Sequence, residues 1–114
     1  MPEDQELLLL AAKAAGVGPV LCYETARNCL RIGDRDSYKL WRPLTDAEDA
    51  FMLGVAVRAD VTRLHHCVHV AGIGLGYGLQ GASIYFDDST LQGRATAERR
   101  AYVELAAKIG ATMP

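Results

Sequence analysis

The chain has 114 residues, half of them apolar and 23% charged, and its formal net charge is −2. This length suits a single domain over residues 1–114 with a packed core, and the composition excludes an intrinsically disordered chain. The near-neutral charge argues against general binding to nucleic acid or to a membrane surface. No apolar run has the length of a membrane span.

A first helix is predicted over residues 3–15. Its first turn is acidic, which suits the positive end of the helix dipole, and Gly16 can end the helix in a left-handed conformation. Residues 7–10 are four consecutive leucines, whereas a surface helix normally has one apolar stripe. We therefore expect Leu8 and Leu9 to be covered on two sides or to meet a partner.

Short strands are predicted at residues 20–23 and 29–32, and a further extended piece at residues 38–41. A second helix follows over residues 46–59 and is nearly apolar all round. Its start resembles a capping box, in which the Thr45 hydroxyl accepts from the Glu48 amide and the Glu48 side chain returns to Thr45.

A long strand is predicted at residues 61–70, another strand at 82–86 and a last helix at 94–109. The resulting order is α-β-β-α-β-β-α, with residues 38–41 as a further extended piece. Short links favour antiparallel pairing, and helices before and after the strand pairs favour a sheet covered on both faces. We therefore expect an α+β fold: an α/β/α sandwich of three helices and one mostly antiparallel sheet of four or five strands.

The segment at residues 41–50, WRPLTDAEDA, resembles the W-x-P-L-T-D-x-x-D-A motif of small phage and prophage proteins that form the phage ABA sandwich domain family. Residues 99–114 and the leucine- and alanine-rich first helix are similar to the ends of such proteins. The resemblance implies a helix–sheet–helix sandwich and a phage or prophage origin. It implies no particular activity.

Excess apolar surface predicts an interaction face, because contiguous apolar patches usually mark interfaces. The residues expected to form this face are Leu8, Leu9, Trp41, Met52 and Val55. We expect a non-enzymatic accessory protein that binds another protein or a second copy of itself.

The segment at residues 27–42 is locally basic and offers a second interpretation. Cations beside aromatic rings hold single-stranded nucleic acid by charge and stacking. The cations concerned are Arg27, Arg31, Arg35, Lys39 and Arg42. The alternative is a solvated hairpin with Trp41 in the core, which the slightly acidic chain favours.

The cluster at residues 65–69 suggests a metal site as a third interpretation. On a strand, alternation places His65, Cys67 and His69 on one face, and imidazole and thiolate are zinc ligands. The spacing lacks a recognised pairing motif, so a polar strand face without metal is favoured.

The glycines Gly76, Gly78 and Gly81 match G-x-G-x-x-G, but a strand rather than a helix is predicted after them. A hairpin loop is therefore favoured over a dinucleotide site, and we expect no cofactor. No catalytic arrangement stands out. The acidic start lacks the basic and apolar order of a signal peptide, so we expect a cytoplasmic protein of a bacterial host.

Overall fold

The computed structural model describes residues 3–72, 79–86 and 90–114. Over these residues the chain forms three helices and six strands in an α-βββ-α-βββ-α order. In chain order they are α1 (Asp4–Ala15), β1 (Val20–Glu24), β2 (Cys29–Gly33), β3 (Tyr38–Trp41), α2 (Ala47–Ala56), β4 (Asp60–Arg63), β5 (Cys67–Gly72), β6 (Gln80–Tyr85) and α3 (Leu91–Thr112). The α+β class is confirmed, and none of the described helices has the length and apolar composition of a membrane span.

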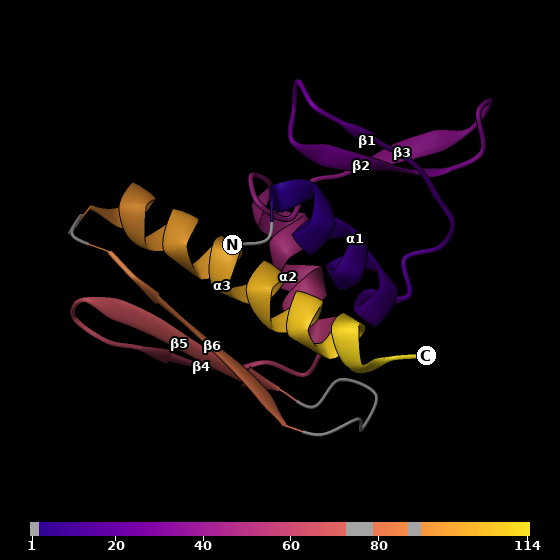
Figure 1. Cartoon of the computed structure of the whole chain (residues 1–114). Coiled ribbons are helices and arrows are strands. Elements are labelled where there is room, and N and C mark those ends of the chain that lie inside the picture. Colours follow the sequence, from indigo (N-terminus) through magenta and orange to yellow (C-terminus); the bar gives the residue numbers. More distant parts are fainter. Residues whose placement is uncertain (1–2, 73–78, 87–89) are drawn as a thin grey trace.

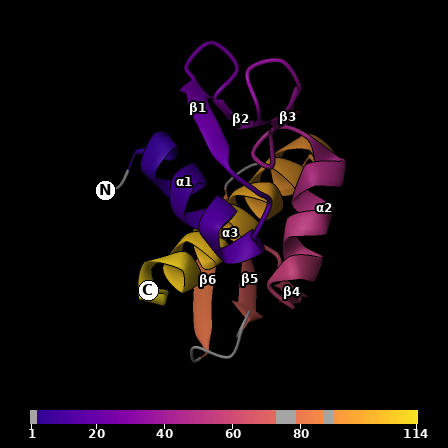
Figure 2. The same cartoon turned by 90° about the vertical axis from the view of Figure 1, so that its right-hand side faces the viewer.

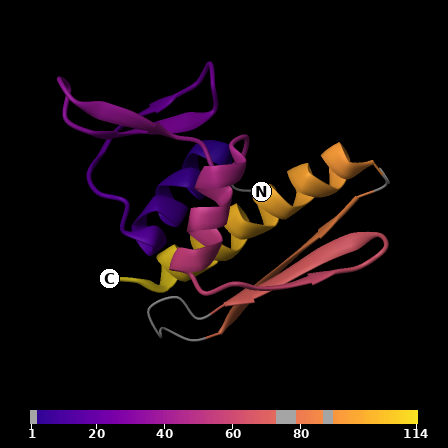
Figure 3. The same cartoon turned by 180° about the vertical axis from the view of Figure 1, so that it is seen from behind.

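The described strands form two antiparallel sheets of three strands each, β1-β2-β3 and β4-β5-β6, so the expected single sheet of four or five strands is wrong. The helices form a layer between the two sheets (Figures 1 and 3). The expected sandwich had one sheet between helices, whereas the structure has helices between two sheets. Each sheet buries one face on the helices, as antiparallel sheets commonly do.

Helix α3 lies at the centre of the fold. It contacts α1 and α2 on one side and strands β5 and β6 on the other (Figure 2). Helix α1 also contacts β1 and β2, so the β1-β2-β3 sheet packs on it. Because α1 is covered by a sheet and by a helix, more than one of its faces is buried. This accounts for Leu7, Leu8 and the partly buried Leu10, whereas Leu9 is exposed.

The predicted long strand at residues 61–70 is interrupted. Strand β4 ends at Arg63, and a turn follows in which the Leu64 amide donates to the Cys67 carbonyl oxygen over 2.8 Å. Strand β5 then returns antiparallel, with Arg63 opposite Val68. The turn was missed because residues 64–66 contain none of the Gly, Pro, Asn or Asp residues that usually mark one.

Helices α1 and α3 cross closely at Gly110. A Cβ atom on Gly110 would overlap the carbonyl oxygen of Leu10 and would lie 2.8 Å from its carbonyl carbon. Only glycine permits this backbone approach.

The capping box at the start of α2 is wrong by one residue. Asp46, not Thr45, is the N-cap, and its carboxylate accepts from the Asp49 amide over 2.9 Å. The Asp49 carboxylate accepts in turn from the Arg42 amide over 2.8 Å, which ties the helix start to the end of β3. Asp accepts a hydrogen bond from an N-terminal amide as well as Thr does, so the sequence is compatible with an N-cap at either Thr45 or Asp46.

Asp46→Ala is therefore expected to lower the free energy of unfolding by about 1 kcal/mol, because it removes the cap. Thr45→Ala, at the exposed neighbouring position, is the matched control and is expected to change stability by less than about 0.5 kcal/mol. Urea unfolding followed by circular dichroism measures both values. A larger loss of stability for Thr45→Ala than for Asp46→Ala would contradict Asp46 as the N-cap and support the predicted capping box at Thr45.

Candidate functional site

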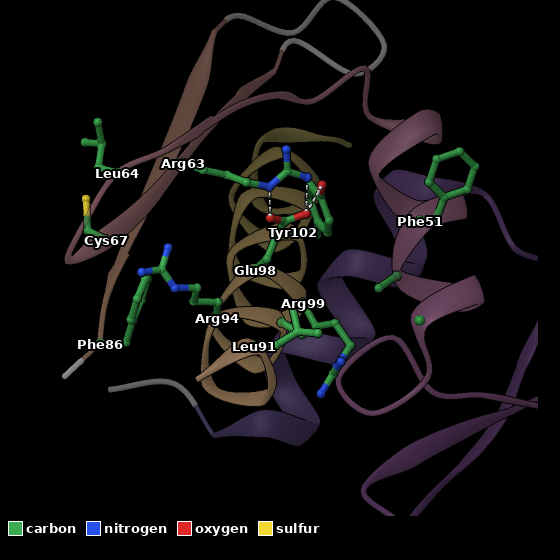
Figure 4. A pocket seen from close by; sticks show the side chains of 13 residues that line it. Phe51, Arg63, Leu64, Cys67, Phe86, Leu91, Arg94, Glu98, Arg99 and Tyr102 are labelled. Atoms are coloured by element: carbon green, nitrogen blue, oxygen red, sulfur yellow. Dashed lines mark hydrogen bonds and ion pairs between the residues drawn. The ribbon is translucent and has the colours of Figure 1, made fainter. Parts of the chain in front are cut away.

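A groove of about 460 Å³ opens between α2, the first half of α3 and the turn that joins β4 to β5 (Figure 4). This volume lies within the range of about 300–1,000 Å³ that is usual for ligand sites. The residues that line it are Ala47, Ala50, Phe51, Arg63, Leu64, Cys67, Phe86, Leu91, Arg94, Ala95, Glu98, Arg99 and Tyr102.

A polar network occupies one wall of the groove (Figure 4). The Arg63 guanidinium donates to both oxygens of Glu98, over 2.7 and 2.9 Å, and the Tyr102 hydroxyl donates to Glu98 over 2.9 Å. Burial raises the pKa of Glu98, but the hydrogen bonds from Arg63 and Tyr102 outweigh this effect and hold the pKa below its ordinary value. Arg63 and Glu98 therefore form an ion pair and neutralise each other's charge.

The ring of Tyr102 packs against the backbone of α2 at Gly54. A Cβ atom on Gly54 would lie 3.3–3.5 Å from three carbon atoms of this ring. The glycine in the middle of the apolar helix is thereby explained, because it leaves room for the aromatic side chain of α3. This contact joins the two helices beside the groove.

Tyr102→Phe is expected to reduce the loss of stability at high pH. Burial and the hydrogen bond to Glu98 raise the pKa of Tyr102 from 10 to about 12. The folded state therefore keeps the phenolic proton after the unfolded chain has lost it. The stability from this group is fully present below pH 10 and is lost as the pH rises through about 12.

Urea unfolding of both proteins below pH 10 and near pH 12 tests this expectation. The other tyrosines are common to both proteins, so the difference between the two curves isolates Tyr102. Equal losses in the two proteins would contradict the raised pKa.

Exposed apolar side chains form the mouth of the groove. Phe51 is 66% exposed, Leu64 51% and Leu91 83%, and they come from α2, from the β4–β5 turn and from α3. Val55, one helical turn from Phe51 and 56% exposed, extends the apolar surface along α2, whereas the equally exposed Met52 lines a second hollow beside Lys39 and Trp41. Three separate elements thus present large apolar side chains to solvent around one cavity.

Two arginines of α3 line the same groove. The Arg94 guanidinium lies over the Phe86 ring, 5.8 Å from its centroid. Arg99 donates from Nε to the Leu44 carbonyl oxygen over 3.0 Å and from Nη2 to the Thr96 hydroxyl over 3.2 Å. In the described ranges neither guanidinium has a carboxylate partner.

The apolar residues predicted to form an interaction face are separated by the fold. Met52, Val55 and Leu9 are exposed, Leu9 at 40%. Leu8 and Trp41 are buried in the core, so their placement on a surface is wrong. Leu8 lies on the covered side of α1, and Trp41 stands opposite Leu30 on the inner face of its sheet.

Most groove residues were not singled out by the sequence, among them Phe51, Leu64, Leu91, Arg94 and Arg99. Phe51 belongs to the apolar run of the second helix and shares the signal that led to Met52 and Val55. The others are distant in sequence, and only the packing of α3 on the β4-β5-β6 sheet brings them together.

The basic segment is partly neutralised. Arg27 and Arg31 both pair with Glu24, over 2.6 and 3.3 Å, and the Arg31 guanidinium lies 5.0 Å from the centroid of the Tyr38 ring. One carboxylate thus serves two of the predicted nucleic-acid residues.

The other cations of this segment do not share one sheet face with Arg31. Lys39 stands opposite Ile32, one position from the Arg31 pair, and successive residues of a strand point to opposite faces. Arg35 lies between β2 and β3 and is exposed. Arg42 follows β3, and its buried Nε atom has no hydrogen-bond partner in the part of the chain that is described.

The three predicted metal ligands are not brought together. His65 lies in the β4–β5 turn, Cys67 lines the groove, and the Nδ1 atom of exposed His69 lies 2.7 Å from the Ser83 hydroxyl. No group of three metal-ligating side chains occurs within residues 3–72, 79–86 and 90–114. The alternation that suggested the site fails because the strand is broken at the turn.

The glycine-rich motif falls mostly outside the described residues, since Gly76 and Gly78 are among those not placed. Gly81 lies in β6, so a strand follows the motif as predicted.

Comparisons of the chain with protein-family models, curated proteins and solved structures give no match. Its class is therefore defined by its own architecture. It is an α+β protein whose described elements form two antiparallel sheets around a helical layer, with an apolar groove between α2, α3 and the β4–β5 turn.

Proposed function

We propose that the chain is a non-enzymatic protein-binding module whose groove receives a segment of another protein. The observation that carries the proposal is the exposure of Phe51, Leu64 and Leu91 around one cavity. Contiguous apolar surface next to a hollow is typical of protein interaction sites, whereas single exposed apolar residues are common and need no explanation. Val55, one helical turn from Phe51, enlarges the surface that a partner would cover.

The proposal includes an accessory role in the cytoplasm of a bacterial host, with a phage or prophage origin. Its support is the resemblance of residues 41–50 to the phage ABA sandwich domain family. The described helices are between the sheets rather than outside them, so the support for this family comes from the motif and not from the layer order.

Site-specific photo-cross-linking tests the protein-binding function. Phe51 is replaced by the photoreactive analogue p-benzoylphenylalanine, and the protein is irradiated in bacterial cells that carry its gene. Tyr38, an aromatic residue 44% exposed on the other sheet, is replaced in the same way as the matched control. Adducts of defined mass are expected from position 51 and not from position 38.

Mass spectrometry of the adduct identifies the occupant. A product of twice the mass of the chain assigns the groove to a second copy, and light scattering of the purified protein then shows a dimer. No adduct at position 51, or equal adducts at both positions, would overturn the function.

A further inference from the structure

The charge of the groove indicates what kind of segment it binds. Arg63 is neutralised by Glu98, whereas Arg94 and Arg99 have no carboxylate partner in the described parts of the chain. The described lining therefore has an excess of positive charge, although the whole chain is slightly acidic. This local excess calls for a negatively charged occupant.

Both guanidiniums are held in place yet retain free donors. Arg94 is positioned through the face of Phe86, a contact that uses none of its five N–H groups. Arg99 uses its Nε and Nη2 atoms on Leu44 and Thr96, so its Nη1 atom remains available. Both side chains are half-buried, and a carboxylate bonded to a half-buried guanidinium is stabilised more than one bonded in water.

The walls of the groove indicate the rest of the occupant. Phe51, Leu64 and Leu91 offer apolar contacts around the cations. The lining therefore suits a peptide with large apolar side chains beside carboxylates. A nucleic acid fits less well, because the described lining offers two guanidiniums among apolar side chains, whereas a phosphate chain is bound along a continuous basic groove.

We infer that the groove binds an acidic amphipathic segment of a partner protein, whose apolar side chains contact Phe51, Leu64 and Leu91 and whose carboxylates bind Arg94 and Arg99. This inference rests on the proposed protein-binding function and specifies its partner. Recognition by an amphipathic segment in an apolar groove with charged edges is a recurring mode of peptide binding.

A displayed library of random short linear peptides tests the inference without knowledge of the partner. Peptides that bind the wild-type protein and fail to bind Phe51→Ser are taken as groove binders. These peptides are expected to be enriched in Asp and Glu next to Leu, Phe or Trp. Their binding is expected to weaken as salt is added, because part of it is electrostatic.

Arginine variants then locate the charge contacts. Arg94→Gln and Arg99→Gln are each expected to weaken groove binders about tenfold, the effect of losing one charge-assisted hydrogen bond. Arg27→Gln, which alters an arginine in the turn between β1 and β2, away from the groove, is the matched control and is expected to leave binding unchanged. Arg94→Glu is expected to bind peptides in which Lys replaces the acidic residues, which a misfolded variant would not do.

The outcomes separate the two proposals. Groove binders without acidic enrichment, or binders unaffected by Arg94→Gln and Arg99→Gln, would overturn the acidic partner and leave protein binding intact. If no selected peptide depends on Phe51 and position 51 also gives no cross-link, the protein-binding function itself fails.

Discussion

Gly110→Ala is expected to lower the free energy of unfolding by about 2–3 kcal/mol. The new Cβ atom would overlap the Leu10 carbonyl oxygen, and backbone cannot turn aside as a flexible side chain can. Helices α1 and α3 would have to separate along the core. An overlap with backbone lies at or above the upper end of the about 1–3 kcal/mol that overpacking usually costs. The better helix propensity of alanine returns at most about 1 kcal/mol of this cost.

Gly16→Ala is the matched control for this substitution. Gly16 ends α1 with φ of 64°, and a Cβ atom there would have no described atom within 4 Å. Its cost is the left-handed backbone alone, about 1 kcal/mol. Urea unfolding of the two variants compares a steric cost with a conformational cost. If Gly110→Ala lost no more stability than Gly16→Ala, the close crossing of α1 and α3 would be contradicted.

Leu8→Ala is expected to lower the free energy of unfolding by about 3 kcal/mol. The Leu8 side chain is fully buried in the core cluster, and its removal leaves a cavity as well as losing apolar burial. The loss is measured by urea unfolding under conditions in which the wild type unfolds in one cooperative transition.

Leu9→Ala is the control, because the same residue type stands at the next position with 40% of its surface exposed. We expect it to cost less than about 1 kcal/mol. Because neither Leu8 nor Leu9 lines the groove, cross-linking from position 51 should persist in Leu9→Ala. Equal destabilisation by both variants would contradict the orientation of α1.

The bounds of the first helix and the positions of several strands follow from local features of the sequence, whereas the second helix is shorter and the third longer than predicted. The first helix ends at Gly16 as predicted, the two predicted strands after it occur, and the predicted extended piece at residues 38–41 is a third strand. These features are local because helix ends, turns and strand alternation depend on residues a few positions apart. The α+β class also follows from them, whereas the choice between Thr45 and Asp46 as cap does not.

The sequence by itself determined that the chain has three helices with strands between them, and that the second helix has more apolar surface than one contact face requires. Only the tertiary structure decided that the strands form two sheets, that Leu8 is buried while Leu9 is exposed, and that Arg63 meets Glu98 across 35 positions of the chain. Burial and pairing depend on how elements distant in sequence pack together. Periodicity gives the apolar face of an element but not the neighbour that covers it.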